Sequence, residues 1–291
     1  MESEGELDAQ SARLIRAVRE YAAAFTAAAD EGFGTDHLNN PQLFAIAALA
    51  RGRGLATGEL ARVAQVNRRT LNEFIQQLEA VGLVEMASDP ADRRVRLVQL
   101  STSGVAAVAE ARKRLAAFFD EAAPLAQEIA DLTAPRSDAP LSGRSSSARQ
   151  AVSADARAAS DPLDLAVMIA QVGMDFSNTV RQRLDDMGLH GMRGPRMHIL
   201  SLLRAHGVLR PGSLSQSLRR SASTVTYLVN LLEQDGLVER SRDSAADGRA
   251  VSIRLTDAGR AAADTYVLGL LDHRDSIHAR FSSLRLGVRA A

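Results

Sequence analysis

Two neighbouring arginines, Arg68 and Arg69, stand at the start of a segment whose apolar residues recur at helical spacing. A guanidinium can donate two hydrogen bonds to the major-groove acceptors of guanine, and an asparagine amide can pair with adenine in the same way. Adjacent arginines at the exposed start of such a helix therefore indicate contacts with DNA bases. The candidate base-contacting residues of this segment are Asn67, Arg68, Arg69, Thr70 and Asn72.

A second polar set stands 154 positions later and has a different chemistry. It offers hydroxyl groups and a tyrosine after two arginines, and these groups suit phosphates, thymine methyl groups and water-mediated contacts. For Thr70 and its counterpart Thr224, helix capping is an equally good explanation. The candidates of this second set are Arg219, Arg220, Ser221, Ser223, Thr224, Thr226 and Tyr227.

Both sets belong to a passage that occurs twice, at residues 41–86 and 195–240, with no gap between the aligned copies. A period of this length is too long for a solenoid repeat and predicts a duplicated domain of ordinary size. The residues of the first copy that recur in the second are Pro41, Leu49, Leu55, Gly58, Leu60, Thr70, Leu78, Glu79, Gly82, Leu83, Val84 and Glu85.

Local signals give each copy the same order of elements. A proline opens a helix, a short helix follows, and a third helix starts at Asn67 or Ser221 and ends before Gly82 or Gly236. A strand, a charged loop and a returning strand come next, as in a hairpin. This order predicts a winged helix-turn-helix, in which the helix after the turn enters the major groove. The short helices are expected at 59–64 and 213–218, and the strands at 83–86 and 251–255.

Long amphipathic helices are expected on either side of each copy, and their apolar faces exceed what a small winged helix can cover. Between the copies, residues 133–160 are rich in Ser, Ala, Pro and Arg and predict a flexible linker with an r.m.s. span of about 30 Å. The predicted domains are therefore 1–132 and 161–291. The long helices are expected at 9–30, 105–132, 164–187 and 258–283.

The charged loop carries the most specific string of the chain. Asp89-Pro-Ala-Asp-Arg-Arg94, followed by Leu100-Ser-Thr-Ser-Gly104 and preceded by Gly82-Leu-Val-Glu85, closely resembles the signature of the multiple antibiotic resistance regulator (MarR) family. The second copy has Asp247-Gly-Arg249 and Leu255-Thr-Asp-Ala-Gly259 in the corresponding places. The resemblance implies a dimeric, mostly α-helical repressor whose terminal helices dimerise and whose wing arginine reaches the minor groove.

By position, the resemblance makes Arg94 and Arg249 the wing-tip arginines, with Asp92 and Asp247 as their ion-pair partners. An arginine on a thin hairpin tip is also suited on physical grounds to a narrow, electronegative groove. Arg93 and Arg96 join the candidates for DNA binding. In the second copy the loop is one residue longer and has glycine in place of Arg93, so we expect a looser or more weakly binding wing.

The family resemblance also implies a small, often aromatic acid bound between the dimerisation helices and the winged helix. Arg193, Arg196 and His198 lie at that place in the second copy and could bind an anionic or aromatic effector. The alternative is ordinary surface charge near the start of a helix. In the first copy the corresponding residues are Asn39, Gln42 and Phe44.

The composition excludes several classes of protein. The net charge is zero, yet residues 51–114 hold eleven Arg or Lys against seven Asp or Glu, and residues 195–260 hold ten against six. A basic surface of this kind suits phosphate binding. With no cysteine, disulfides and thiolate metal sites are absent, and the histidine spacing does not favour zinc. No membrane-length apolar run, signal peptide, cofactor-binding motif or catalytic motif is found, so we expect a cytoplasmic protein that is not an enzyme.

We therefore expect a mainly α fold with small β wings, made of tandem winged helix-turn-helix domains that form an intramolecular pseudo-dimer. Its partners are double-stranded DNA and a small effector, with no metal and no membrane. The expected function is that of a transcriptional repressor relieved by the effector, reading an asymmetric operator through two non-identical helices. The alternatives are a protein-interaction scaffold in which one copy has lost DNA binding, and a chain that dimerises again.

Overall fold

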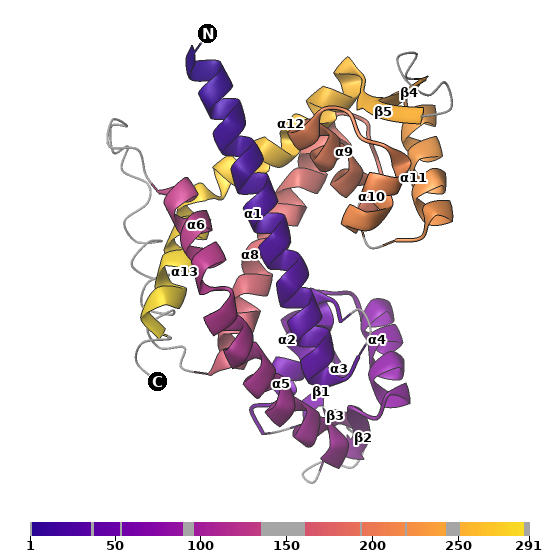
Figure 1. The fold of residues 1–291 in the computed structure, drawn as a ribbon. Helices are drawn as coiled ribbons and strands as arrows, with labels where there is room; N and C mark the ends of the chain where they lie inside the picture. Colours follow the sequence, from indigo (N-terminus) through magenta and orange to yellow (C-terminus); the bar gives the residue numbers. More distant parts are fainter. Residues whose placement is uncertain are drawn as a thin grey trace. The chain divides into compact units, whose positions relative to one another are not determined.

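The computed structural model of the chain describes residues 2–35, 38–52, 54–89, 96–134, 161–192, 194–218, 220–242 and 251–287 (Figure 1). The chain forms two compact units, and each takes residues from both sides of the segment 133–160. Unit 1 comprises Met1–Ala17 and Asp175–Arg274, and unit 2 comprises Val18–Met174 and Asp275–Ala291.

Unit 2 contains a winged helix followed by long helices. The first winged helix, as we call it from here on, consists of α2 (Asn40–Leu49), β1 (Leu55–Ala56), α3 (Thr57–Val63), α4 (Arg68–Ala80), β2 (Val84–Ser88) and β3 (Arg96–Leu100). The remaining helices of unit 2 are the second half of α1 (Glu2–Phe33), α5 (Thr102–Glu121), α6 (Ala123–Thr133), the first half of α8 (Pro162–Asp186) and α13 (Arg274–Gly287).

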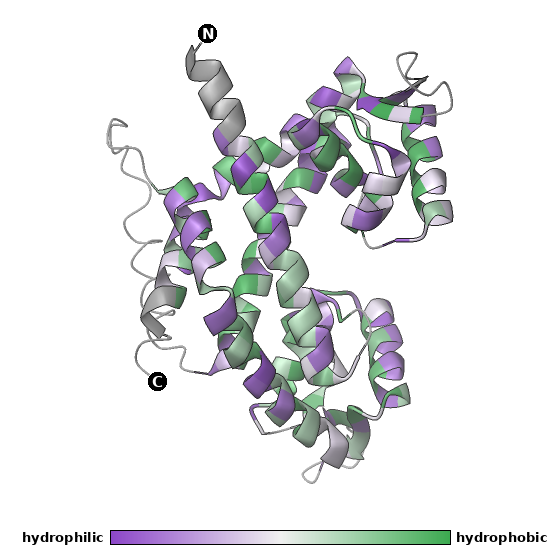
Figure 2. Cartoon of the chain, in the orientation of Figure 1, coloured by the Kyte–Doolittle hydropathy of each residue, from purple (hydrophilic) through white to green (hydrophobic). Residues whose placement is uncertain are grey.

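The strands of unit 2 form an antiparallel sheet in the order β1-β3-β2. Val98 on the central strand lies opposite both Leu55 and Met86 and is 1% exposed, so the sheet is tied to the core at this residue. Buried leucines and isoleucines of α2, α3 and α4 complete the small core, and α4 turns its polar side outward (Figure 2). These helix residues are Leu43, Ile46, Leu60, Leu71, Ile75 and Leu78.

Unit 1 repeats the same order of elements. The second winged helix consists of α9 (Pro195–His206), α10 (Pro211–Leu218), α11 (Ala222–Gln234), β4 (Val238–Arg242) and β5 (Val251–Leu255), and α12 (Asp257–Asp272) follows it. β4 and β5 pair antiparallel, and a bridge joins Leu209 to Ile253. Leu209 is the counterpart of Leu55, which makes the same kind of contact with β3 in unit 2.

A glycine after the returning strand fixes the following helix in both winged helices. A Cβ atom on Gly104 would lie 1.9 Å from the Leu83 carbonyl oxygen, and one on Gly259 would lie 1.8 Å from that of Leu237. Only a residue without a Cβ atom fits such a close approach. The glycines of the predicted signature therefore have a packing function, which is to seat α5 and α12 against the turns that follow α4 and α11.

The structure confirms the helix caps that the sequence predicts at both ends of α4 and α11. Asn67 accepts a hydrogen bond from the Thr70 amide at 2.9 Å, and Ser221 accepts one from Thr224 at 3.3 Å, as N-caps do. Gly82 has φ 75° and Gly236 has φ 70°, the left-handed conformation of a glycine that ends a helix.

Three details of the predicted elements were wrong. The expected helix 258–283 is two helices, since α12 ends at Asp272 and α13 begins at Arg274. The expected helix 105–132 is likewise two helices, α5 and α6, with Pro124 in the first turn of α6 as the helix-start signal, and Thr133, assigned to the linker, is the last residue of α6. Strand β1 has only two residues, too few to produce an alternating pattern. Within the described residues, no helix is long and apolar enough to cross a membrane.

Candidate nucleic-acid interface

The start of α4 presents the first set of candidate DNA-binding residues. The Asn67 Oδ1 atom accepts a hydrogen bond from the Thr70 amide, so in this structure the Asn67 side chain caps α4. Arg68, Arg69 and Asn72 are exposed on the first two turns of α4, while Leu71 is buried beneath them. The helix therefore turns its basic and amide side chains outward and anchors itself through an apolar face.

The two arginines are held only loosely. Arg69 Nε lies 3.4 Å from Glu73 Oε1, one helical turn later, and the Arg69 side chain is 91% exposed. An exposed pair of this type contributes little stability, so it does not prevent Arg69 from binding a phosphate or a base. The Arg68 guanidinium extends towards Gly58 on α3, where an added Cβ atom would be 3.7 Å away.

The start of α11 presents a different surface. Its sequence from Ala222 to Gln234 contains no Arg or Lys, and Tyr227 is its exposed large hydrophobic side chain, at 62% exposure. Arg220, just before the helix, is exposed. The second recognition surface is therefore nearly uncharged where the first is basic.

The hydroxyl groups of α11 already have partners within the helix start. Ser221 Oγ lies 3.0 Å from Ser223 Oγ and 2.9 Å from Thr224 Oγ1. Thr226 Oγ1 donates to the Ala222 carbonyl at 2.8 Å. A hydroxyl can donate once and accept twice, so these contacts reduce its capacity to bond a base without removing it.

The wings are described in part. Arg96 is exposed at the start of β3, opposite Ser88 on β2. Of the other predicted site residues, Arg93, Arg94, Arg193, Arg219 and Arg249 lie outside the described residues.

A cluster that was not foreseen ties the second wing to its recognition helix. On β4, Arg240 Nη1 forms an ion pair with Glu233, and its Nη2 donates to Asn230 Oδ1. Both partners belong to α11. The residue at the corresponding place in the first winged helix is Met86, so this arginine stabilises the second wing where the first has an apolar residue.

Of the candidate effector-binding residues, Arg196 is engaged in contacts within the protein. Its Nη1 lies 3.1 Å from Asp235 Oδ2 just after α11, and its Nη2 donates to the Gly191 carbonyl at 2.6 Å. The Arg196 side chain is 20% exposed. His198 is exposed at the start of α9. The guanidinium thus links the start of α9 to the end of the recognition helix.

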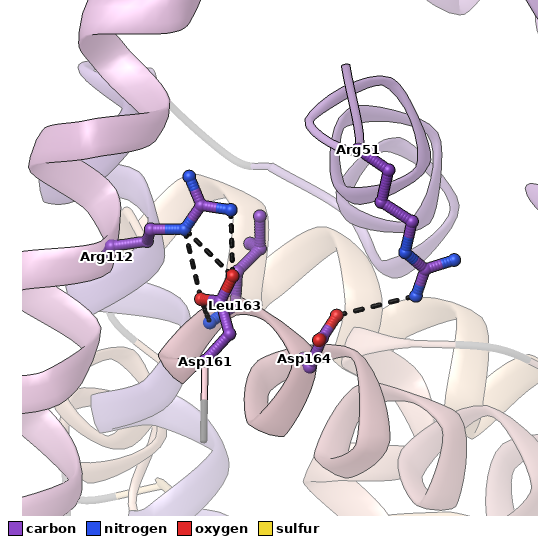
Figure 3. Close-up of polar contacts among 5 residues, drawn as sticks. All are labelled: Arg51, Arg112, Asp161, Leu163 and Asp164. Atoms are coloured by element: carbon purple, nitrogen blue, oxygen red, sulfur yellow. Dashed lines mark hydrogen bonds and ion pairs between the residues drawn. The ribbon is translucent and has the colours of Figure 1, made fainter. Parts of the chain in front are cut away.

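The first winged helix and α5 both make polar contacts at the beginning of α8 (Figure 3). Arg112 on α5 donates to both oxygens of Asp161, with the closest approach at 2.8 Å, and Arg51 Nη2 lies 3.4 Å from Asp164 Oδ1. Asp161 Oδ1 also accepts a hydrogen bond from the Leu163 amide at 2.9 Å. A bidentate contact fixes both the distance and the orientation of the two groups.

The ionisation of this pair reflects its contacts. Burial alone would raise the pKa of the Asp161 carboxyl group, but the hydrogen bonds from Arg112 and from the Leu163 amide outweigh it and hold the pKa below its ordinary value. The hydrogen bond to Asp161 correspondingly raises the pKa of the Arg112 guanidinium. Asp161 is therefore charged near neutral pH and holds the start of α8 against α5.

Helices from both ends of the chain also meet in the aromatic core of unit 2. The Tyr21 ring on α1 packs edge-on against Phe118 on α5 and Phe281 on α13, with centroids 5.2 and 4.9 Å away. His278 Nδ1 lies 2.8 Å from the Ala130 carbonyl oxygen on α6. Burial raises the pKa of the Tyr21 phenol, which stays neutral. Within the described part of the chain, no group of His, Asp and Glu residues could hold a metal ion.

Comparison with known proteins places a family domain on the second winged helix. The MarR family model matches residues 194–251. The HTH-type transcriptional repressor MdtR of Bacillus subtilis is 28% identical over 108 residues, which are 37% of this chain and 66% of MdtR. The HTH-type transcriptional repressor NicR of Pseudomonas putida is 29% identical over 96 residues, which are 33% of this chain and 54% of NicR.

The chain thus spans less than two thirds of the length of these curated relatives. A solved structure, that of the transcriptional regulator Tm0710 from Thermotoga maritima, is 30% identical; the likeness covers 36% of this chain and 69% of that one, with a TM-score of 0.30. These homologues are transcriptional regulators and not enzymes.

Proposed function

Because residues 194–251 form a MarR family domain, we propose that the protein is a DNA-binding transcriptional regulator, and specifically a repressor. The observation that carries this proposal is the exposed basic start of α4 on a winged helix, with Arg68 and Arg69 outward and Leu71 buried. This is the arrangement by which a recognition helix presents side chains to base edges in the major groove.

We further propose that the two winged helices belong to an intramolecular pseudo-dimer. Dimers of this architecture place two recognition helices about one DNA turn apart. In unit 2, residues of α8 and α13, which follow the segment 133–160, pack with α1, α5 and α6, which precede it. The Arg112–Asp161 ion pair and the Tyr21–Phe281 contact support this arrangement, because they let one chain supply both sides of a helical dimer core.

The proposed operator is asymmetric. A basic α4 favours guanine-containing sequence, whereas α11 offers hydroxyls and Tyr227 and favours phosphate, thymine or water-mediated contacts. Selection of bound fragments from genomic DNA, followed by footprinting, tests the function. Recovery of a defined site with protection of about two DNA turns is expected, and failure to enrich any sequence would contradict it.

A specific observation also favours a second function for part of the molecule. The α11 surface lacks basic side chains, and Arg240 is paired with Glu233 instead of being directed to a phosphate. The second winged helix could therefore serve as a protein-interaction scaffold while the first binds DNA. Salt dependence separates the two functions. If both winged helices bind the operator, log affinity falls steeply with log salt, and removing the second half-site weakens binding. If the second winged helix is a scaffold, removing the second half-site changes neither the affinity nor its dependence on salt.

We propose that a small aromatic or anionic effector relieves repression by binding near the start of α9. Arg196 joins that start to the end of α11, so an anion that competes with Asp235 for its guanidinium would loosen the recognition helix. The double variant Arg196→Ala with His198→Ala lacks the ion pair with Asp235, so it should bind the operator more weakly than the wild type and show no further release by the inducer. Unchanged induction of the double variant would contradict this site.

A further inference from the structure

The turn between α3 and α4 holds a residue in an unfavourable backbone conformation. Gln65 has φ 57°, and it is the only residue other than glycine with a positive φ among those that the structure describes. The Gln65 amide donates to the Arg62 carbonyl and the Val66 amide donates to the Ala61 carbonyl, the pattern that ends many helices. Glycine is the usual residue at this position because it has no Cβ atom to clash.

The Gln65 side chain makes a contact that glycine could not make. Its Nε2 donates to Oε1 of Gln171 on α8 at 2.8 Å. The adjacent residue of α8, Ala170, accepts a hydrogen bond from Asn40 Nδ2 at 3.2 Å, at the start of α2. Consecutive residues of α8 thus contact the first winged helix at the start of α2 and at the turn that leads into α4.

The position of Gln65 along the chain connects this contact to the candidate DNA-binding residues. Gln65 is two residues before Asn67, the cap of α4, and three before Arg68. A short, hydrogen-bonded turn transmits a shift of Gln65 directly to the first turn of the recognition helix, since little chain lies between them that could absorb it. Residues held in sparsely populated backbone conformations persist where the surrounding structure determines them, and they cluster at functional sites.

We propose that Gln65 and Gln171 are positioning residues, through which α8 sets the placement of the first turn of α4 for DNA binding. This rests on the proposed function, because the readout of positioning is operator affinity. It adds to that function a coupling between α8, which follows the segment 133–160, and α4, which precedes that segment. The glutamine side chain makes this coupling, which a glycine at the same left-handed position could not make.

The test compares stability with binding in the full chain. The variant Gln65→Gly removes the backbone strain together with the side chain, so its melting temperature should equal or exceed that of the wild type. Its affinity for the selected operator should nevertheless fall about two- to tenfold, the effect of losing one hydrogen bond. Gln171→Ala should lower the affinity by the same factor, whereas Gln171→Glu, which keeps an acceptor oxygen for the Gln65 amide, should bind like the wild type.

A double variant and a control make the test specific. Gln65→Gly combined with Gln171→Ala should lower the affinity by less than the product of the two single losses, since both variants remove the contact between these side chains. Gln127→Ala, which loses only a hydrogen bond to Asp131 within α6, should leave the affinity unchanged. Wild-type affinity in Gln65→Gly, or losses that multiply in the double variant, would overturn the proposal.

Hydrogen exchange separates this proposal from the proposed function. The amides of Thr70 and Leu71 should exchange about two- to tenfold faster in Gln65→Gly and Gln171→Ala than in the wild type, without any DNA present. If these amides respond while the wild type binds no operator, the contact positions α4 but the protein is not a DNA-binding regulator. Equal exchange in all variants would show that Gln171 does not position α4.

Discussion

The two winged helices share their order of elements and differ in the chemistry of the helix that each presents. In the first, α4 begins with exposed Arg68 and Arg69. In the second, α11 has no basic residue, its hydroxyls bond one another, and Arg240 of the wing is paired with α11. The glycines that seat α5 and α12 are retained in both, at nearly the same distance from a carbonyl oxygen. The packing is thus common to both, and the surface chemistry is not.

This difference has a consequence for DNA recognition. A homodimer offers the same surface to both half-sites, whereas one chain with two surfaces can distinguish them. Under the proposed function, the basic surface contributes both long-range attraction and base contacts, while the nearly neutral surface depends on shape, phosphate positions and water. We therefore expect substitutions to have unequal effects where the surfaces differ and equal effects where the packing is shared.

The largest expected difference is in base recognition. Replacing Arg68 and Arg69 together with alanine should weaken operator binding at least about thirtyfold, since each good contact with a base contributes about 1–3 kcal/mol. Specificity should relax in one half-site only. Fluorescence anisotropy with operators mutated in either half measures both effects, and Ser223→Ala with Thr226→Ala is the matched control on α11, with a smaller loss expected. An equal loss of sequence specificity in both half-sites would show that the two surfaces do not read different half-sites.

The packing glycines should give equal effects. Gly104→Ala and Gly259→Ala each place a Cβ atom within 2 Å of a carbonyl oxygen, and the helix must shift to accommodate it. Overpacking of this kind costs typically about 1–3 kcal/mol of unfolding free energy. Chemical denaturation monitored by circular dichroism gives the values. Val105→Ala, one residue from Gly104 and 58% exposed, is the control. A large loss for one glycine and none for the other would show that the two winged helices are packed differently.

A smaller inequality is expected at the wing tips. Replacing Arg94 with alanine should lower the affinity and make the slope of log affinity against log salt shallower by about one ion. The corresponding change at Arg249 should have a smaller effect, because the second loop has Gly248 in the place of Arg93. Binding titrations at several salt concentrations, with melting temperatures measured in parallel, provide the test. A matching loss of stability and affinity at Arg94 would identify it as a structural residue.

The smallest effect concerns the ion pair at the start of α8. The pKa of Asp161 is lower in the folded protein than in the unfolded chain, so its stabilisation is complete above the ordinary pKa of an aspartate, about 4, and is lost as the pH falls through the folded value. Asp161→Asn should lower the melting temperature near neutral pH, and the difference from the wild type should disappear under acidic conditions. A difference that is independent of pH would show that the charge of Asp161 does not matter.

Local signals explain why much of this arrangement could be predicted from the sequence. The caps Asn67 and Ser221 and the glycines at 82 and 236 act through bonds to their nearest neighbours, so their function can be read from a few residues. The order of elements in each winged helix followed from these signals and from apolar periodicity. The exposed position of Arg68 and Arg69 followed from their place opposite the buried stripe of α4.

The remaining features depend on contacts distant in sequence. Nothing near Gln65 indicates a left-handed glutamine, because the reason for it, the contact with Gln171, lies 106 positions away. No proline or glycine marks the break at His273 between α12 and α13. Arg196 looked available to an effector in the sequence, whereas its partner Asp235 lies 39 positions later. Such contacts are set by tertiary packing and leave no local pattern.

The central claim is that one chain reads one asymmetric operator with two different surfaces. It is tested most directly by native mass spectrometry of the protein on operators in which the half-sites are exchanged or duplicated. We expect one chain to bind per natural operator, and the affinity to fall markedly when the guanine-dependent half is replaced by a second copy of the other half. Two chains bound to a perfect palindrome, with equal affinity for both duplicated operators, would contradict it.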